Sequence, residues 1–195
     1  MKVLFLGPTD SRLVDYLRST GDDVVARFNR IDPAWLDEHP CEFLVSYGYQ
    51  HILPKTVLDR FPDRAINLHV ALLPWNRGSD PNFWSIVEDT PKGVSIHYLD
   101  EGIDTGDIIV QHELAFSADD TLRTSFEKLH VAIETLFREH WPHIRAGTCA
   151  RTPQQGPGSF HRATDKNRLI HLLTDGWDTP IARLATQVSR NVRGS

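Results

Sequence analysis

Short apolar runs alternate with helix-spaced apolar residues along the first third of the chain. Four runs predict strands, at residues 3–6, 24–28, 43–45 and 65–68. Leu13, Tyr16 and Leu17 recur at helical spacing after the first run, and residues 54–61 predict a helix before the fourth. Parallel strands need crossover connections, so this alternation predicts a Rossmann-like α/β fold, with a mostly parallel sheet covered by helices on both faces.

The rest of the chain changes pattern. Residues 94–99 and 108–114 predict two further strands, joined by a loop at residues 100–107 that is rich in Gly and Asp. Apolar residues spaced 4, 3, 4 and 3 apart predict one long amphipathic helix: Leu122, Phe126, Leu129, Ile133 and Leu136. Its N-terminal cap could be Asp119, Asp120 or Thr121, and its expected end is at about Pro142. Short helices are expected at residues 169–173 and 181–188.

Chain length sets the domain organisation that we expect. A chain of 195 residues can bury about 70% of its unfolded surface, which is enough for one core. The segment PQQGPGS at residues 153–159 interrupts the pattern. We therefore expect a catalytic domain at residues 1–152 and a C-terminal appendage at residues 153–195 that packs on it.

Charge and composition exclude several classes of protein. The formal net charge is -5, with 21 basic and 26 acidic residues, so the chain lacks the positive field of a general nucleic-acid binder. No apolar stretch approaches the roughly 20 residues of a membrane span, and no export signal is evident. Cys41 and Cys149 are too few for a disulfide framework. We expect a cytoplasmic protein that binds neither membranes nor nucleic acids.

Two polar residues at the end of the fourth strand are the first candidates for chemistry. Asn67 and His69 are two positions apart, so their side chains point to the same face at the carboxyl edge of the sheet, where open α/β sheets build sites. Asp104 lies in the Gly- and Asp-rich loop, a type of segment that carries function more often than packing. The alternative roles are a satisfied core histidine and a turn aspartate.

An ordered set of residues between positions 47 and 111 resembles the signature of the folate-dependent formyltransferases. The set comprises Asn67, His69, Leu72-Leu73-Pro74, Arg77-Gly78, Gly93-Val94, His97 and Asp104-Thr105-Gly106-Asp107. Ordered composite spacing of this kind is more specific than a lone glycine motif. Within the family, the segment from Pro81 to Ile109 is most similar to the sugar N-formyltransferases that act on nucleotide-linked amino sugars.

The resemblance implies transfer of a formyl group from 10-formyltetrahydrofolate to a primary amine. Asn67 and His69 would then stabilise the negative charge that develops on the formyl oxygen. Asp104 would favour the charged form of His69 and relay the proton that leaves the attacking amine. The reaction needs no metal, because the formyl group is already activated on its carrier. The same resemblance implies a role in lipopolysaccharide O-antigen biosynthesis, with a homodimer as one oligomeric state.

The resemblance also suggests where the two substrates bind. Folate is expected to contact backbone groups at four positions: Tyr47, Asp100, Gly102 and Ile103. Arg77 is the expected diphosphate clamp, because a guanidinium matches phosphate oxygens in a fork, and its alternative is a salt bridge to Asp80. Thr9, Asp10 and Trp84 complete the substrate-binding candidates. Asp10 would repel a phosphate unless it caps the helix that follows.

Other functions remain as alternatives. Glycinamide ribonucleotide formyltransferase is of similar size, but the loop after the first strand has a single glycine, Gly7, to cradle a phosphate. Methionyl-tRNA formyltransferase would need an RNA-binding domain and positive charge. A catalytically inactive relative that binds folate or a nucleotide sugar is the non-enzyme alternative. His140 and His143 lack the further ligands of a metal site.

Overall fold

A six-stranded sheet organises the part of the chain that the computed structural model describes, residues 1–186. Its strands are β1 (Lys2–Leu6), β2 (Asp23–Arg27), β3 (Phe43–Ser46), β4 (Ala65–His69), β6 (Gly93–Tyr98) and β7 (Ile108–Glu113). They lie in the order β2-β1-β3-β4-β6-β7, and the pairs β1–β2, β1–β3 and β3–β4 are parallel. The predicted α/β fold with a mostly parallel sheet is confirmed.

The chain divides into two compact units. The first contains Met1–His69, Ile96–Val110 and Leu136–Gln154, and the second contains Val70–Ser95, Gln111–Thr135 and the residues from Gln155 onward. The second unit therefore draws on three separate stretches of the chain. The sequence-based division at residues 152 and 153 stays a prediction.

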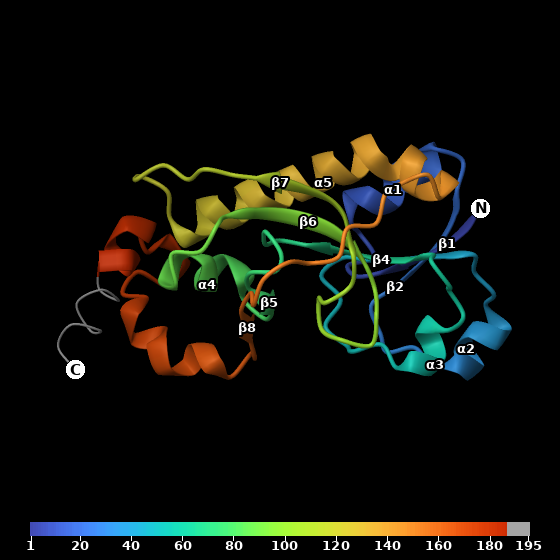
Figure 1. The fold of residues 1–195 in the computed structure, drawn as a ribbon, viewed down its shortest axis with the longest axis horizontal. Coiled ribbons are helices and arrows are strands. Elements are labelled where there is room, and N and C mark those ends of the chain that lie inside the picture. The colour runs from blue at the N-terminus through green and yellow to red at the C-terminus, as the bar shows by residue number, and fades with distance from the viewer. Residues whose placement is uncertain (187–195) are drawn as a thin grey trace. The chain divides into compact units, whose positions relative to one another are not determined.

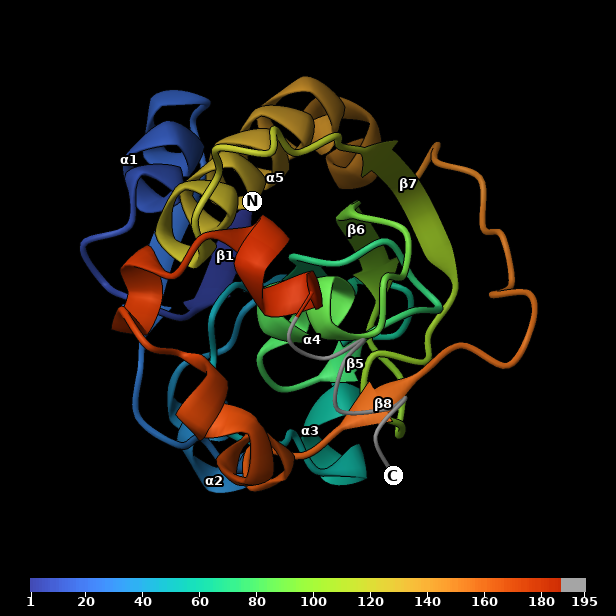
Figure 2. The ribbon, with the colours of Figure 1, turned by 90° about the vertical axis from the view of Figure 1, so that its left-hand side faces the viewer.

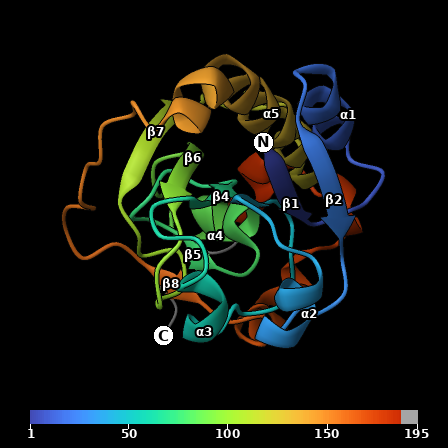
Figure 3. The ribbon, with the colours of Figure 1, turned by 90° about the vertical axis from the view of Figure 1, so that its right-hand side faces the viewer.

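Alternating side chains on the strands of the first unit bury both faces of the sheet. Leu4, Leu6 and Leu44 pack with residues of α2 (Pro33–Glu38) and α3 (Lys55–Leu58). The strand residue Phe43 packs edge-on against Trp141 of α5 (Leu122–Ala146), with ring centroids 5.2 Å apart. Figure 3 shows α1 (Arg12–Ser19) and α5 on one side of the strands and α2 and α3 on the other.

The helices follow from caps as much as from apolar spacing. Ser11 caps α1, its hydroxyl accepting from the Leu13 amide at 3.3 Å, so Asp10 is not the cap. Asp32 caps α2 in the same way, accepting from the Trp35 amide at 2.8 Å. The apolar pattern missed α2 because only one of its six residues, Leu36, is buried. The helix expected at residues 54–61 is confirmed as the shorter α3.

The expected end of the long helix at Pro142 is wrong. Thr121 precedes its first residue and caps it, but α5 continues through Pro142 to Ala146. Proline has no N–H to donate to the carbonyl of Arg138, four residues earlier. The hydroxyl of Tyr16 donates to that carbonyl instead, at 2.8 Å, so the helix loses no partner there.

The second unit combines short elements with one apolar cluster. Its elements are β5 (Arg77–Gly78), α4 (Pro81–Val87), β8 (Phe160–His161) and the 3-10 helices Asp165–Leu172 and Gly176–Asp178, together with the first half of α5. The strands β5 and β8 pair in parallel, and they appear beside α4 in Figure 2. Apolar residues from α4, α5 and the C-terminal segment form the cluster: Phe83, Trp84, Ile86, Leu122, Leu172 and Leu184.

The C-terminal helices match the prediction as far as the structure describes them. The helix expected at residues 169–173 overlaps the longer 3-10 helix Asp165–Leu172. Residues 181–186 are helical, and the expected continuation through Gln187 and Val188 lies outside the described residues. None of the helices within residues 1–186 combines the length and apolarity that crossing a bilayer requires.

Candidate active site

The strand β4 brings Asn67 and His69 to the edge of the sheet. It pairs with β3, where Asn67 is in register with Ser46. Ile66 and Leu68, which alternate with the two polar residues, are buried. His69 is the last residue of the strand and is 6% exposed. The predicted placement of Asn67 and His69 on one face at the carboxyl end of β4 is confirmed. Figure 1 labels β4 among the strands of the sheet.

The loop at residues 99–107 presents Asp104 through a tight set of local contacts. Asp100 accepts from the Gly102 amide at 3.0 Å and from the Thr105 hydroxyl at 2.7 Å. A Cβ at Gly106 would lie 1.9 Å from the carbonyl oxygen of Tyr98, so this position requires glycine. Asp104 itself has φ of 55°, a left-handed conformation that costs a non-glycine residue about 1 kcal/mol. The loop therefore holds Asp104 in a conformation that it would not adopt alone.

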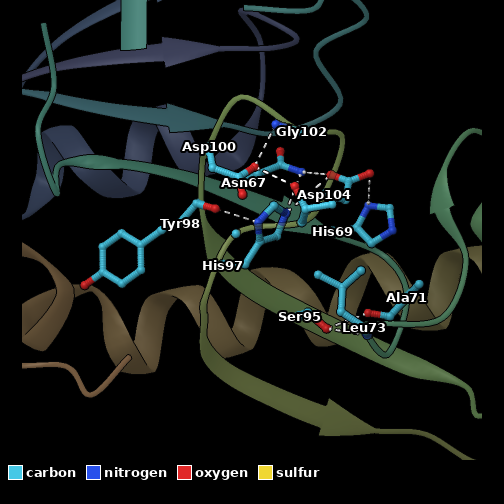
Figure 4. A network of polar contacts seen from close by, with 12 residues as sticks. Asn67, His69, Ala71, Leu73, Ser95, His97, Tyr98, Asp100, Gly102 and Asp104 are labelled. Atoms are coloured by element: carbon cyan, nitrogen blue, oxygen red, sulfur yellow. Dashed lines mark hydrogen bonds and ion pairs between the residues drawn. The ribbon is translucent and has the colours of Figure 1, made fainter. Parts of the chain in front are cut away.

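Three polar side chains of the first unit meet at the carboxylate of Asp104 (Figure 4). Asn67 Nδ2 donates to Asp104 Oδ1 at 3.0 Å. His69 Nδ1 lies 3.6 Å from Asp104 Oδ2, and His97 Nε2 lies 3.3 Å from Asp104 Oδ1. The Asp104 side chain is 11% exposed. The structure thus brings together the three residues that the sequence selected as catalytic candidates, and it adds His97.

His97 has a defined ring orientation because of its backbone contact. Its side chain is fully buried on β6, and its Nδ1 lies 2.8 Å from the carbonyl oxygen of Tyr98. A carbonyl oxygen only accepts, so Nδ1 carries a hydrogen. The other ring nitrogen, Nε2, lies 3.3 Å from both Asn67 Nδ2 and Asp104 Oδ1. Its contact with Asp104 is attractive only when one of those two atoms is protonated, so the pair can share a proton.

His97 was not among the predicted catalytic residues, although two features of the sequence point to it. His97 belongs to the ordered set of residues that resembles the formyltransferases, and it lies in the apolar run of residues 94–99. A polar residue in a run that is otherwise buried needs a partner. Only the fold identifies that partner, because Asn67 is 30 residues away. The neighbouring Tyr98 stays neutral, because burial raises the pKa of its phenol.

The candidate folate-binding residues occupy two places in the first unit. Tyr47 is buried after β3, its amide donates to the Leu6 carbonyl at 2.9 Å, and its own carbonyl lies against Gly7. Asp100, Gly102 and Ile103 are exposed on the loop that carries Asp104. The Ile103 side chain is 39% exposed, which leaves an apolar surface on that loop. Their contact with folate stays a prediction.

The candidate substrate-binding residues are divided between the units. Thr9 and Asp10 are exposed between β1 and α1 in the first unit. Arg77 is half-buried on β5 of the second unit, where its amide donates to the Ser159 carbonyl at 3.0 Å. Trp84 is 1% exposed and stacks on His161, with ring centroids 3.9 Å apart. Substrate binding by Trp84 stays a prediction, and this burial is typical of a core residue.

Metal-ligand clusters and reactive cysteines are two other common kinds of chemical site. Within residues 1–186, no three His, Cys, Asp or Glu side chains are placed to hold a metal ion together. Cys41 and Cys149 are both free, and burial raises the pKa of each thiol. Because the thiolate is the reactive form, neither cysteine is a candidate nucleophile. The Asp104 cluster is therefore the best-supported candidate active site among the described residues.

Comparison with known proteins gives a family for this arrangement. A family model described as "Formyl transferase" matches residues 26–139, which is more than half of the chain. A crystal structure of the formyltransferase PseJ from Anoxybacillus kamchatkensis, in complex with UDP-4,6-dideoxy-4-formamido-L-AltNAc and tetrahydrofolate, is 48% identical. The match covers 94% of this chain and 97% of that chain, with a TM-score of 0.91.

More distant relatives agree on the fold. A protein from Mycobacterium tuberculosis described as a likely sugar N-formyltransferase is 25% identical, with a TM-score of 0.74 and coverage of 86% of this chain and 78% of that chain. Methionyl-tRNA formyltransferase from Thermodesulfovibrio yellowstonii is 37% identical over 59% of this chain, but the match spans only 38% of that protein's length. The chain described here belongs to the formyl transferase family.

Proposed function

We propose that this protein transfers a formyl group from 10-formyltetrahydrofolate to the primary amine of a nucleotide-linked amino sugar, with a UDP-linked 4-amino sugar as the first candidate. The observation that carries the proposal is the cluster at Asp104, where a carboxylate meets an amide and two imidazoles within 3.0–3.6 Å. The 48% identity with PseJ, a formyltransferase crystallised with a UDP-linked formamido sugar and tetrahydrofolate, supports the choice of acceptor and donor.

The reaction requires that one proton be moved and one negative charge be stabilised. The neutral amine attacks the formyl carbon, forming a C–N bond and placing negative charge on the formyl oxygen. Collapse of this intermediate breaks the bond from the carbon to N10 of the folate. Asp104 takes a proton from the attacking nitrogen, and the leaving N10 gains one. Asp104 suits this role because its carboxylate lies within 3.6 Å of the His69 ring and 3.3 Å of the His97 ring.

The stabilisation of the oxyanion falls to Asn67 and His69. Asn67 directs its amide nitrogen at Asp104 and His97, so donation to the formyl oxygen requires it to share one of these hydrogens. His69 places Nδ1 3.6 Å from Asp104 Oδ2, and its other ring nitrogen is the proposed second donor. Each donor of this kind contributes about 2.7 to 4 kcal/mol to transition-state stabilisation.

The proposed substrate contacts involve residues outside this cluster. The exposed residues Asp100, Gly102 and Ile103 offer peptide edges and an apolar side chain to a flat pteridine ring, with Tyr47 as the fourth contact. Arg77 is the proposed diphosphate clamp, and Thr9 and Asp10 complete the nucleotide-sugar candidates. Because Ser11 rather than Asp10 caps α1, the Asp10 carboxylate would have to contact a part of the nucleotide sugar other than its phosphates. The formyl group is already activated as an amide of folate, so the proposed steps need no metal ion.

The cellular setting and the oligomeric state are part of the same proposal. Free thiols at Cys41 and Cys149 fit a reducing compartment, so we place the protein in the cytoplasm. We propose that the formylated product serves the biosynthesis of a surface polysaccharide, such as an O-antigen. A homodimer is the proposed assembly, and light scattering of the purified protein would measure it.

An aminoacyl-tRNA is the second candidate acceptor, because methionyl-tRNA formyltransferase from Thermodesulfovibrio yellowstonii is 37% identical over part of the chain. The net charge of -5 argues against it, since neutralisation of phosphates supplies most of the affinity for RNA. The experiment incubates the protein with 10-formyltetrahydrofolate and either a UDP-linked 4-amino sugar or methionyl-tRNA.

Mass spectrometry then identifies the formylated product. Formylation of the sugar supports the proposal, and formylation of the tRNA overturns it in favour of the second acceptor. Stabilisation against heat by folate and by the nucleotide sugar, without turnover of either acceptor, would instead identify an inactive binding relative. A ligand at 100 times its Kd should add about 2.7 kcal/mol to the free energy of unfolding, which makes that outcome measurable.

A further inference from the structure

The segment that follows α5 runs along the loop that carries Asp104. Arg151 forms ion pairs with Asp107, at 3.2 Å, and with Asp63. Thr152 and Ile108 exchange two backbone hydrogen bonds, of 2.8 and 3.0 Å. Residues 151–154, here called the post-helix segment, are thereby fixed to the carboxyl end of this loop, within the first unit.

Gln154 ends the post-helix segment and reaches the loop with its side chain. Its Nε2 donates to the carbonyl oxygen of Asp104 at 2.8 Å and to the carbonyl oxygen of Gly106 at 2.9 Å. An amide nitrogen has two hydrogens, so these two contacts use both. One half-buried side chain thus holds the peptide group that follows Asp104 and the one that follows Gly106.

The hydrogen bond from Gln154 acts on a backbone conformation that Asp104 would otherwise disfavour. Its left-handed conformation, with φ of 55°, is disfavoured for a residue with a side chain. Asp100 holds the Gly102 amide and the Thr105 hydroxyl, on either side of Asp104. Neither contact involves the carbonyl of Asp104, which Gln154 binds. A strained conformation persists only when its surroundings over-determine it, and Gln154 supplies that constraint at the strained residue.

We infer that Gln154 is a positioning residue that holds the Asp104 carboxylate in register with Asn67, His69 and His97. The inference rests on the proposed role of Asp104 in formyl transfer. Gln154 would act through the backbone and touch neither substrate. It lies in the segment from residue 153 onward that the sequence places outside the catalytic domain, 50 residues from Asp104. A fragment that ends before Gln154 would therefore keep the three catalytic candidates and lose their alignment.

The test replaces the two hydrogens of Gln154 with an acceptor of the same shape. In Gln154→Glu, a carboxylate faces two carbonyl oxygens and repels them. We expect kcat to fall by about tenfold to a hundredfold, as for other displacements of a catalytic group by about 1 Å, while KM for each substrate changes less than about twofold. Gln155→Glu makes the same charge change on the exposed neighbouring side chain and should keep kcat within about twofold of wild type.

Two further measurements separate positioning from general destabilisation. Gln154→Lys restores hydrogen donors and should recover a larger share of kcat than Gln154→Glu. The kcat of Gln154→Glu relative to wild type should also rise as pH falls from about 7 to about 5, because a protonated glutamic acid regains one donor. Unchanged kcat in Gln154→Glu, or equal losses in the Glu and Lys variants with a flat pH ratio, would overturn the inference.

A readout without turnover keeps this inference apart from the proposed function. The ring NMR signals of His69 and His97 report their contacts with Asp104, whatever the acceptor. Gln154→Glu and Asp104→Asn should each move both signals, and Gln155→Glu should move neither. If wild type formylates no acceptor, the proposed function fails while these shifts still support the positioning role. If the signals of Gln154→Glu match those of wild type, the positioning role is wrong.

Discussion

Two carboxylates of the first unit, Asp22 and Asp104, are both almost enclosed, yet they have different partners. The side chain of Asp22 is fully buried and lies 3.0 Å from the N-terminal ammonium of Met1 and 3.1 Å from the Arg145 guanidinium. It also accepts from the indole N–H of Trp141 at 2.9 Å. Asp104 is 11% exposed and is surrounded by Asn67, His69 and His97, none of which carries a fixed charge.

The type of partner distinguishes a structural carboxylate from a candidate catalytic one. At Asp22, the Met1 ammonium and the Arg145 guanidinium match the negative charge of the carboxylate and tie α5 to the N-terminus. At Asp104 the partners are an amide and two imidazoles, none of which is a permanent cation. Burial alone therefore does not separate the two, whereas the kind of partner does.

The largest effect is expected from removing the charge of Asp104. In Asp104→Asn, kcat should fall by about a thousandfold, since general acid–base groups contribute roughly 10² to 10⁴. The melting temperature should stay within about 2 °C, because Asn67, His69 and His97 carry no fixed charge that the substitution would leave unpaired. Steady-state kinetics and a thermal scan measure both. A variant that keeps more than about a tenth of wild-type kcat would remove the contrast with Asp22.

The corresponding substitution at the other carboxylate is Asp22→Asn. It leaves the Met1 ammonium and Arg145 without their carboxylate, and we expect the free energy of unfolding to fall by about 2 kcal/mol. This is below the cost of breaking a fully buried pair, because Arg145 is 34% exposed. At 25 °C, kcat and both KM values should stay within about twofold. Urea unfolding measures the first effect. A large loss of kcat in a folded variant would show that the two carboxylates are not functionally distinct.

Arg77 tests whether a cation that only binds behaves differently from a group that reacts. In Arg77→Lys, a point charge replaces a fork, so KM for the nucleotide sugar should rise about tenfold, or about 1.4 kcal/mol. The kcat and the KM for folate should stay near wild type, because a diphosphate is gripped equally in the ground and transition states. Kinetics with each substrate varied in turn decide the matter. An unchanged KM for the nucleotide sugar, or a selective loss of folate binding, refutes the clamp.

The smallest effect concerns a histidine that burial keeps neutral. Burial lowers the pKa of His130 on α5, with a small opposing effect from Glu134. Above pH of about 6.5 the ring is neutral in both the folded and unfolded states, and below it the unfolded chain takes up a proton first. Stability is therefore lost as pH falls below about 6.5. His130→Gln should reduce that loss by less than about 1 kcal/mol between pH 7 and pH 5.

Urea unfolding at the two pH values, compared between wild type and His130→Gln, measures this difference. His112, which is exposed on β7, provides a matched control, since its substitution by Gln should leave the acid dependence of stability unchanged. An identical acid dependence in wild type and His130→Gln would show that burial does not hold this ring neutral. His130 would then not differ from an exposed histidine in its effect on stability.

Periodicity along the chain was enough for the fold and for half of the candidate site. The apolar runs predicted all six strands of the sheet. The central strands β3 and β6 gave the clearest signal, because every residue in them is buried. The two-residue spacing of Asn67 and His69 predicted that they share a face, because a strand alternates strictly. The error at Pro142 has a local cause, since no sequence rule supplies the Tyr16 hydroxyl that satisfies the Arg138 carbonyl.

The residue types of the site, the strands that carry them and the family to which they belong all follow from the order of amino acids along the chain. Which of these residues touch depends on the folded arrangement of strands and loops. Asn67 meets Asp104 across 37 residues, and Gln154 meets it across 50. Contacts at such separations depend on strand order and on how a loop closes, neither of which leaves a periodic signal. His97 and Gln154 therefore joined the site through the fold, because a buried polar residue shows its purpose only when its partner is in place.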